Sequence, residues 1–249
     1  MLSFPRSTAS LSAVLALALS AMAAIAGTAV AASGPLPRVA QVIAAGLPLR
    51  VSAFGSSSTE GIGGSSPAAS YPARLGVELA SLLPDNPSEV LNRGIGGQDS
   101  DDMIARLPTV LAEQPDLVIW QTGSNDPLRG VPLERFAAET RQGIEAIRAA
   151  GADVILMEPQ LCMKLSAQIN ADAYRHMLRR IGDEMGVPVI RRHDLMRSWL
   201  DSGVLTAAQM LSADGLHMAD GGYAMLAKEA ARTIVVLAGQ SGRLGTSQR

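Results

Sequence analysis

Residues 116–126 have the sequence Asp-Leu-Val-Ile-Trp-Gln-Thr-Gly-Ser-Asn-Asp, and this stretch decides the fold class. The apolar run in its first half includes two β-branched residues and predicts a buried strand over residues 116–121. The second half, Gly123-Ser124-Asn125-Asp126, is a polar turn directly after that strand. Strands buried on both faces are typical of parallel α/β sheets, which bind ligands beyond the carboxyl ends of their strands.

The rest of the chain alternates between short apolar runs and segments with helical spacing. Strands are predicted at residues 49–54, 90–92, 116–121, 153–157 and 187–190. Helices are predicted at residues 71–83, 101–114, 133–150, 171–185 and 222–237. Pro84 and Pro115 block the continuation of two helices, and Gly151 and Gly186 end two others. This alternation predicts one α/β domain, a three-layer αβα sandwich in which helices cover both faces of a five-stranded parallel sheet.

The composition excludes several classes of protein. Of the 249 residues, 47 % are hydrophobic and 18 % are charged, which is too apolar for a disordered chain. The formal net charge of -2 leaves no basic excess, so we expect no nucleic-acid partner. A single cysteine, Cys162, excludes an intramolecular disulfide framework and a cysteine-based zinc cluster. We expect neither a metal nor an organic cofactor.

The first 31 residues have the pattern of a secretory signal peptide. Arg6 is followed by an apolar run from Leu11 to Ile25 and by the small residues Ala29-Val30-Ala31. The run is short for a membrane span, although an uncleaved anchor is the alternative. We therefore expect export to a bacterial periplasm or to the medium, with no stable membrane span after cleavage. Residues 32–48 are expected as a leader, 49–238 as the folded domain and 239–249 as a flexible C-terminal tail.

Four polar motifs follow the predicted strands or lie near the C-terminus. They are Gly55-Ser56-Ser57-Ser58-Thr59-Glu60-Gly61, Asn92-Arg93-Gly94-Ile95-Gly96-Gly97-Gln98, Gly123-Ser124-Asn125-Asp126 and Asp214-Gly215-Leu216-His217. Each is weak alone, because Ser/Gly loops and Asn-Asp helix caps are common. Together they supply a hydroxyl nucleophile, oxyanion donors, a base and an orienter for that base, which are the groups that acyl transfer needs.

These motifs, in this order, resemble those of the SGNH (GDSL-type) hydrolase superfamily, and the resemblance covers residues 49–237. That superfamily usually shows Gly-Asp-Ser-x-x-x-Gly, an oxyanion glycine, Gly-x-Asn-Asp and Asp-x-x-His. The resemblance implies a flavodoxin-like strand order, 2-1-3-4-5, and a serine esterase or lipase-like hydrolase that acts on ester bonds. Ser56 stands where the superfamily usually has Asp. The flanking residues place the nucleophile at Ser57, with Ser56 and Ser58 as alternatives.

The resemblance also implies the roles of the site residues. Ser57, His217 and Asp214 would form the catalytic triad, and the Ser57 N–H, the Gly97 N–H and the Asn125 side chain would hold the oxyanion. The physical reasoning agrees, because a turn that starts a helix favours negative charge and a glycine lets the main chain approach a carbonyl closely. His193 is the only rival base, and no superfamily motif supports it.

The substrate and the alternatives are less well defined. Leu161 and Met163 follow the strand at 153–157 and either line an acyl pocket or belong to the core. We expect small acyl groups on small-molecule, carbohydrate or lipid esters, and a monomer. One alternative is a flavodoxin-like phosphate- or flavin-binding protein, because a Ser/Thr-rich loop at a helix start also cradles phosphate. Another is a non-catalytic, glycan-binding hydrolase homologue.

Overall fold

A five-stranded parallel sheet forms the centre of the protein. The computed structural model describes Met1 and residues 34–246, with side chains through residue 240, so the predicted signal peptide beyond Met1 lies outside the described residues. The strands are β1 (Leu49–Gly55), β2 (Ser88–Gly94), β3 (Leu117–Gln121), β4 (Asp153–Met157) and β5 (Val189–Ile190). They pair in parallel in the order β2-β1-β3-β4-β5. The predicted fold class and strand order are confirmed.

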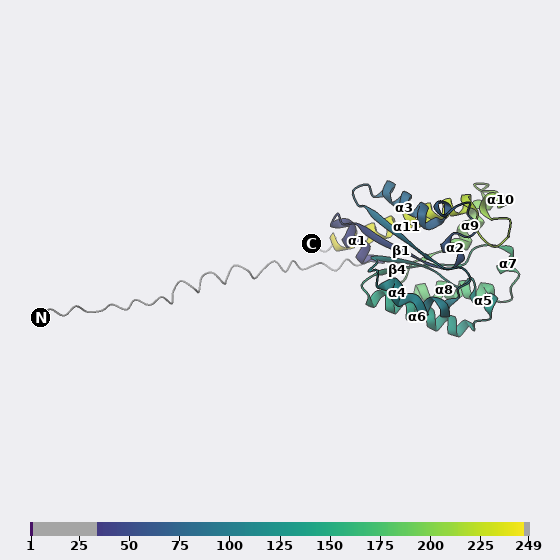
Figure 1. Cartoon of the computed structure of the whole chain (residues 1–249), viewed down its shortest axis with the longest axis horizontal. Helices are drawn as coiled ribbons and strands as arrows, with labels where there is room; N and C mark the ends of the chain where they lie inside the picture. Colours follow the sequence, from purple (N-terminus) through teal and green to yellow (C-terminus); the bar gives the residue numbers. More distant parts are fainter. Residues whose placement is uncertain (2–33, 247–249) are drawn as a thin grey trace. The chain divides into compact units, whose positions relative to one another are not determined.

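Helices cover both faces of the sheet (Figure 1). One face carries α1 (Pro37–Ala44), α3 (Tyr71–Leu82) and α11 (Asp220–Thr246), and the other carries α4 (Ser100–Leu111), α6 (Leu133–Ala149) and α8 (Ala171–Met185). Successive side chains of β1 enter opposite cores: Ala53 packs on the first face and Phe54 on the second, and both are fully buried. Burial on both faces explains why the strands are nearly continuous apolar runs.

Five further helices and a 3₁₀ turn (Pro67–Ala69) connect these elements. The helices are α2 (Ser57–Glu60), α5 (Asp126–Arg129), α7 (Met163–Ser166), α9 (Arg192–Asp201) and α10 (Ala207–Met210). Four of them have only four residues each, too few for a periodic pattern. Figure 1 shows all five helices at one end of the sheet, on the right of the view. This is the end to which the carboxyl ends of the strands point.

Two predicted boundaries are wrong. Residues 32–48, expected as a leader, contain α1, which packs into the core with Leu36 and Val39 fully buried. The Val39 N–H also donates to the Asp153 carboxylate over 2.9 Å, so this segment belongs to the domain. Residues 239–246, expected as part of a flexible tail, continue helix α11. Among the described residues, none of the helices combines the length and the apolar character that crossing a membrane requires.

Glycines allow α2 to lie directly against the ends of the strands. A Cβ atom at Gly94, the last residue of β2, would stand 2.0 Å from the Glu60 nitrogen. A Cβ atom at Gly55 would stand 2.3 Å from Thr59 Oγ1. Any side chain at either position would push α2 away from the sheet. The glycines therefore fix the position of the turn that carries Ser57.

Candidate active site

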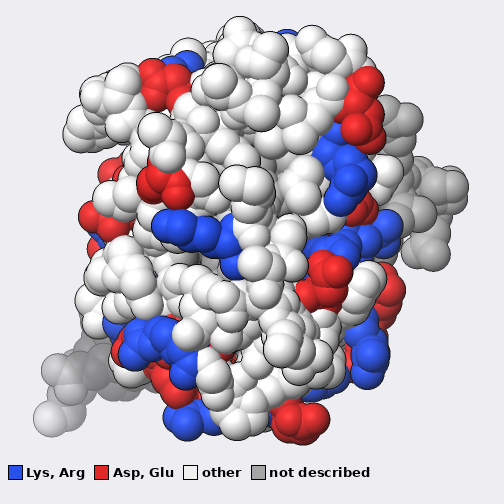
Figure 2. Space-filling view, turned by 90° about the vertical axis from the view of Figure 1, so that its right-hand side faces the viewer, with Lys and Arg blue, Asp and Glu red and all other residues white. Residues whose placement is uncertain are grey.

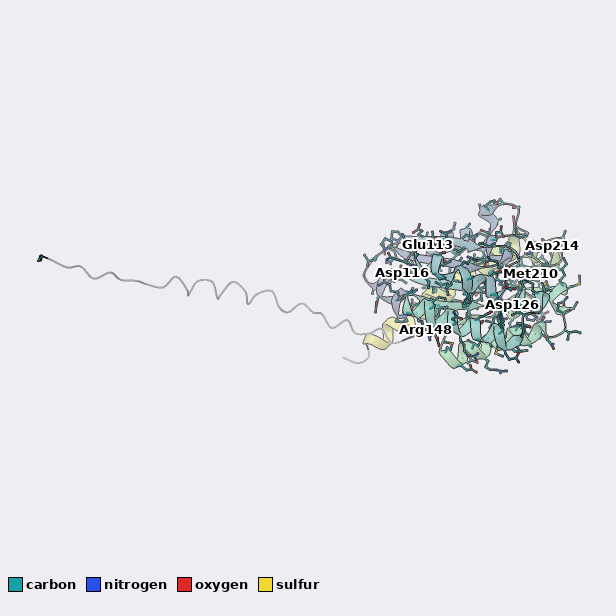
Figure 3. All side chains as sticks on the ribbon, turned by 60° about the horizontal axis from the view of Figure 1, so that its bottom comes forward. Glu113, Asp116, Asp126, Arg148, Met210 and Asp214 are labelled. Atoms are coloured by element: carbon teal, nitrogen blue, oxygen red, sulfur yellow. The ribbon has the colours of Figure 1, made fainter. Side chains whose placement is uncertain are left out.

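The four sequence motifs meet at the carboxyl end of the sheet. Helix α2 follows β1, the Gly96-Gly97 turn follows β2, and Asn125 lies between β3 and α5. The Asp214–His217 motif lies in the loop between α10 and α11. Figure 3 shows Asp126 and Asp214 at this end of the molecule, with Glu113 and Asp116 at the opposite end.

Ser57, His217 and Asp214 form a continuous hydrogen-bonded row. His217 Nε2 lies 2.9 Å from Ser57 Oγ, and His217 Nδ1 lies 2.6 Å from Asp214 Oδ2. The side chain of His217 is 13 % exposed and that of Asp214 is 40 % exposed. The imidazole is thus held on one edge by a carboxylate, and its other edge faces a hydroxyl. This arrangement suits the transfer of a proton from that hydroxyl.

Asp214 is held in its ionised form by four donors. Partial burial raises the pKa of its carboxyl, but hydrogen bonds from the His217 ring and from nearby backbone N–H groups outweigh that effect. The backbone donors are the N–H groups of Leu216 (2.8 Å) and His217 (2.9 Å), and the Ser212 hydroxyl also donates, over 2.7 Å. The resulting pKa lies well below its ordinary value. A permanent negative charge next to Nδ1 keeps the proton on that nitrogen and leaves Nε2 free to accept one.

Among the three consecutive serines, Ser57 is the one whose hydroxyl meets His217. Ser56 is buried, and both its N–H and its hydroxyl donate to Gln121 Oε1, over 3.0 and 3.1 Å. Ser58 is also buried, with 1 % of its surface exposed. Ser57 is partly exposed and begins α2, where backbone N–H groups have no intrahelical acceptor.

Two of the three predicted oxyanion donors, the Gly97 N–H and the Asn125 side chain, lie in two adjoining loops. Gly97 has a positive φ of 78°, and the Asn125 side chain donates from Nδ2 to the carbonyl of the next residue, Gln98, over 2.7 Å. An amide NH₂ group has two hydrogens, so one remains for a ligand. The sequence motif did not single out Gly96, yet a Cβ atom there would stand 3.8 Å from Ser57 Cβ. The pair of adjacent glycines, Gly96 and Gly97, was the sequence feature that could have predicted this close approach of the main chain to Ser57.

Asp126, directly after Asn125, connects this loop to the start of helix α4. Its Oδ1 accepts hydrogen bonds from the Ser100 N–H (3.0 Å) and the Ser100 hydroxyl (2.5 Å). Burial raises the pKa of the Asp126 carboxyl. Arg129 holds the same region from outside, because it donates to the Gly97 carbonyl over 3.0 Å and pairs with Asp99 at 2.9 Å. These contacts connect the glycine turn after β2 to the segment that contains Asn125 and Asp126.

The predicted pocket residues Leu161 and Met163 and the alternative base His193, all among the residues that the structure describes, form no hydrogen bond with Ser57, His217 or Asp214. Leu161 is partly buried against the core on the α1, α3 and α11 face, and Met163 is 79 % exposed at the start of α7. His193, the rival base, lies in the first turn of α9, with its ring 3.5 Å from Asp194. A polar cavity of about 110 Å³ lies after β4, lined by Gly123, Gln160, Leu165, Arg175 and His193 among others. In the described part of the chain, no cluster of three metal-ligating side chains is found.

Comparison with known proteins supplies the family. A family model described as the non-GDSL lipase-like family matches residues 22–239. The chain belongs to this family. That description agrees with Ser56 standing at the position of the usual aspartate.

Individual relatives point in the same direction. An arylesterase from Vibrio mimicus is 29 % identical over 161 residues, which cover 62 % of this chain and 76 % of that protein. Thioesterase 1/protease 1/lysophospholipase L1 from Escherichia coli K12 is 28 % identical over 158 residues, covering 62 % and 72 %. The structure of a lipase/acylhydrolase from Enterococcus faecalis superposes with a TM-score of 0.62 at 25 % identity and covers 78 % of this chain and 96 % of that one. The predicted resemblance to the SGNH hydrolase superfamily is confirmed, and the chain is a lipase-like hydrolase acting on ester bonds.

Proposed function

We propose that the protein is an exported serine esterase that cleaves carboxylic esters through Ser57, His217 and Asp214. The observation that carries the proposal is the pair of hydrogen bonds that joins Ser57 Oγ to His217 Nε2 and His217 Nδ1 to Asp214 Oδ2, at 2.9 and 2.6 Å. No element of this row needs to move to begin proton transfer.

The row supports a two-step reaction. Ser57 Oγ attacks the ester carbonyl while His217 Nε2 takes its proton, and His217 then gives that proton to the leaving alkoxide as the C–O bond breaks. A water molecule, deprotonated by His217, attacks the acyl-serine and releases the carboxylic acid and free Ser57. Asp214 stays ionised throughout and stabilises the His217 imidazolium that forms within each step, before that proton passes to the leaving alkoxide in the first step and back to Ser57 Oγ in the second.

The oxyanion of each tetrahedral intermediate would be held by three N–H donors. We assign them to the Ser57 backbone, the Gly97 backbone and the free hydrogen of the Asn125 amide. The tether from Asn125 to the Gln98 carbonyl supports this assignment, because it fixes the amide beside the glycine turn. Preorganised donors of this kind typically contribute about 100- to 1,000-fold each to turnover.

The surface around the site favours uncharged esters. Figure 2 shows this end of the molecule, where an uncharged band runs between charged side chains on either side. Exposed apolar side chains occur in segments that follow three strands: Ile62, Ile95 and Leu128. We propose small acyl groups on small-molecule, carbohydrate or lipid esters as substrates. Two names among the similar proteins, the arylesterase and the lysophospholipase, span this range.

The Ser57→Ala variant tests the catalytic proposal. We expect wild-type protein to hydrolyse p-nitrophenyl acetate and S57A to lose that turnover while its melting temperature stays near that of the wild type. Ser58→Ala, a neighbouring serine in the same short helix, is the matched control and should keep its activity. A wild-type protein that is folded but inactive on short esters would instead support the non-catalytic, glycan-binding alternative. Detection of the mature chain in the periplasm or medium tests the export.

A further inference from the structure

A chain of buried side-chain hydrogen bonds runs beneath the proposed nucleophile and base. It starts at Ser56, whose hydroxyl donates to Gln121 Oε1 over 3.1 Å. Gln121 Nε2 donates to Ser124 Oγ, and the Ser124 hydroxyl donates to Gln160 Oε1, each over 3.2 Å. Gln160 Nε2 then donates to the main-chain carbonyl of Leu216 over 3.1 Å. The chain thus begins one residue before the nucleophile and ends one residue before the base.

Every link in this chain points in the same direction. Gln121, Ser124 and Gln160 each accept a hydrogen bond on one side and donate one on the other, so neighbouring bonds polarise and strengthen one another. The four side chains are nearly inaccessible to water, with exposed fractions between 0 and 6 %. Water therefore cannot easily replace a missing link, and a deleted partner leaves a buried polar group unsatisfied.

The orientation of Gln160 is set by a buried cation. Arg192 is fully buried, and it donates from Nε to the Glu158 carbonyl over 2.9 Å and from Nη2 to Gln160 Oε1 over 2.8 Å. A guanidinium has only donors, so it must face the amide oxygen of Gln160. The amide nitrogen is then directed at the loop of the base. Hydrogen bonds to an ionised group are also about twice as strong as neutral ones.

The base loop is closed by internal hydrogen bonds, and contacts on its C-terminal side also hold it, because Asp220 accepts from the Ser65 N–H and hydroxyl over 2.8 and 2.6 Å. Asp214 Oδ1 accepts from the backbone N–H groups of Leu216 and His217, which locks these residues into one compact turn. Those bonds fix His217 relative to Asp214, but they do not fix the turn relative to α2. The hydrogen bond from Gln160 to the Leu216 carbonyl connects the turn to the loop after β4. The buried hydrogen bonds through Ser124 and Gln121 extend this connection to Ser56.

We propose that Gln160 is a positioning residue that holds the base loop at the distance at which His217 reaches Ser57. This inference rests on the proposed function. Loss of the Gln160 side chain shifts the whole Asp214–His217 turn relative to Ser57 without changing the hydrogen bonds inside that turn. A misplacement of about 1 Å in a reacting group typically costs about 100-fold in rate, while the substrate-binding surface is unaffected.

Two substitutions of Gln160 test the hydrogen bond that it donates to the Leu216 carbonyl. Gln160→Met keeps the length of the side chain and removes all its hydrogen bonds. Gln160→Glu keeps oxygen atoms for Ser124 and Arg192 but replaces the donor to the Leu216 carbonyl. Both variants should lower kcat by about 10- to 100-fold with KM changed less than about threefold. Labelling of the nucleophile by a fluorophosphonate should slow in proportion to kcat. Gln168→Met, the same change at an exposed position between α7 and α8, should leave kcat and the labelling rate unchanged.

The melting temperatures and the S57A variant decide how the outcomes are interpreted. If Q160M is unstable, Q160E carries the test, because its carboxylate still pairs with the buried Arg192. Wild-type kcat in a folded Q160E, or a rise in KM with kcat unchanged, would overturn the positioning role. If instead S57A retains the turnover of the wild type, the proposed function itself fails, whatever Gln160 does.

Discussion

Replacement of Asn125 by alanine separates two roles that the structure gives to one side chain. The amide tethers the glycine turn through its bond to the Gln98 carbonyl, and its second hydrogen is available to the oxyanion. The tether affects stability, whereas the second hydrogen affects only the transition state. The two effects can be measured independently in the same variant.

The expected magnitudes differ strongly. Loss of one side-chain hydrogen bond to the backbone costs about 1 kcal/mol, and for a domain of this size that lowers the melting temperature by about 2–4 °C. Loss of one oxyanion donor lowers kcat by about 100- to 1,000-fold, or about 3–4 kcal/mol of transition-state stabilisation. We therefore expect N125A to be a well-folded protein with a severe defect in kcat and a small change in KM.

The assay is steady-state hydrolysis of a p-nitrophenyl ester together with thermal unfolding. Asn86→Ala is the matched control, because Asn86 also tethers main chain, donating to the carbonyls of Ile43 and Leu47 at the amino end of β1. N86A should lose at least as much stability as N125A and keep its kcat. The assignment of Asn125 to the oxyanion is refuted if N125A loses stability but retains kcat within about threefold.

Three further predictions follow from individual contacts. Asp214→Asn should lower kcat by about four orders of magnitude without unfolding the protein, because an amide no longer holds the Nδ1 proton; a loss below tenfold in single-turnover kinetics would contradict this role. Gly143→Ala should destabilise the protein by about 1–3 kcal/mol, because its Cβ would stand 2.3 Å from the Trp120 ring; thermal unfolding measures the loss, and an unchanged melting temperature would show that the ring moves freely. Burial raises the pKa of Asp126 above its ordinary 3.8, so the native state binds that proton more tightly and stability falls as pH rises from about 4 through the raised pKa. Asp126→Asn removes this pH dependence. The melting temperature of the variant minus that of the wild type should therefore rise as the pH increases over this interval. A difference that stays constant with pH would contradict the raised pKa of Asp126.

The strands and the close approach of the Asp214 and His217 side chains were predictable because they leave local signals in the sequence. The run from Leu117 to Trp120 is apolar and partly β-branched, and it becomes the central strand next to β1. The Asp214–His217 spacing fits one tight turn, as the structure shows. Helix α1 was missed because residues 32–48 were expected as a leader, although Pro37 is well suited to the first turn of a helix.

The buried polar chain left no such signal. Gln121 ends strand β3, Ser124 lies in the loop after β3 and Gln160 lies in the loop after β4, so their hydrogen bonds depend on the sheet bringing these segments together. Arg192 carries a charge, and a charged residue is expected on the surface unless a partner is known. The sequence indicated Ser56 as a departure from the usual aspartate and as an alternative nucleophile, whereas the structure shows its hydroxyl donating to Gln121.

Reaction of the folded wild-type protein with a fluorophosphonate, followed by mapping of the modified peptide, tests the central claim most directly. We expect one adduct, on Ser57, and we expect it to form much more slowly in the His217→Ala variant because the base no longer activates the hydroxyl. An adduct on Ser56 or Ser58, or a folded wild-type protein with no adduct at all, would contradict it.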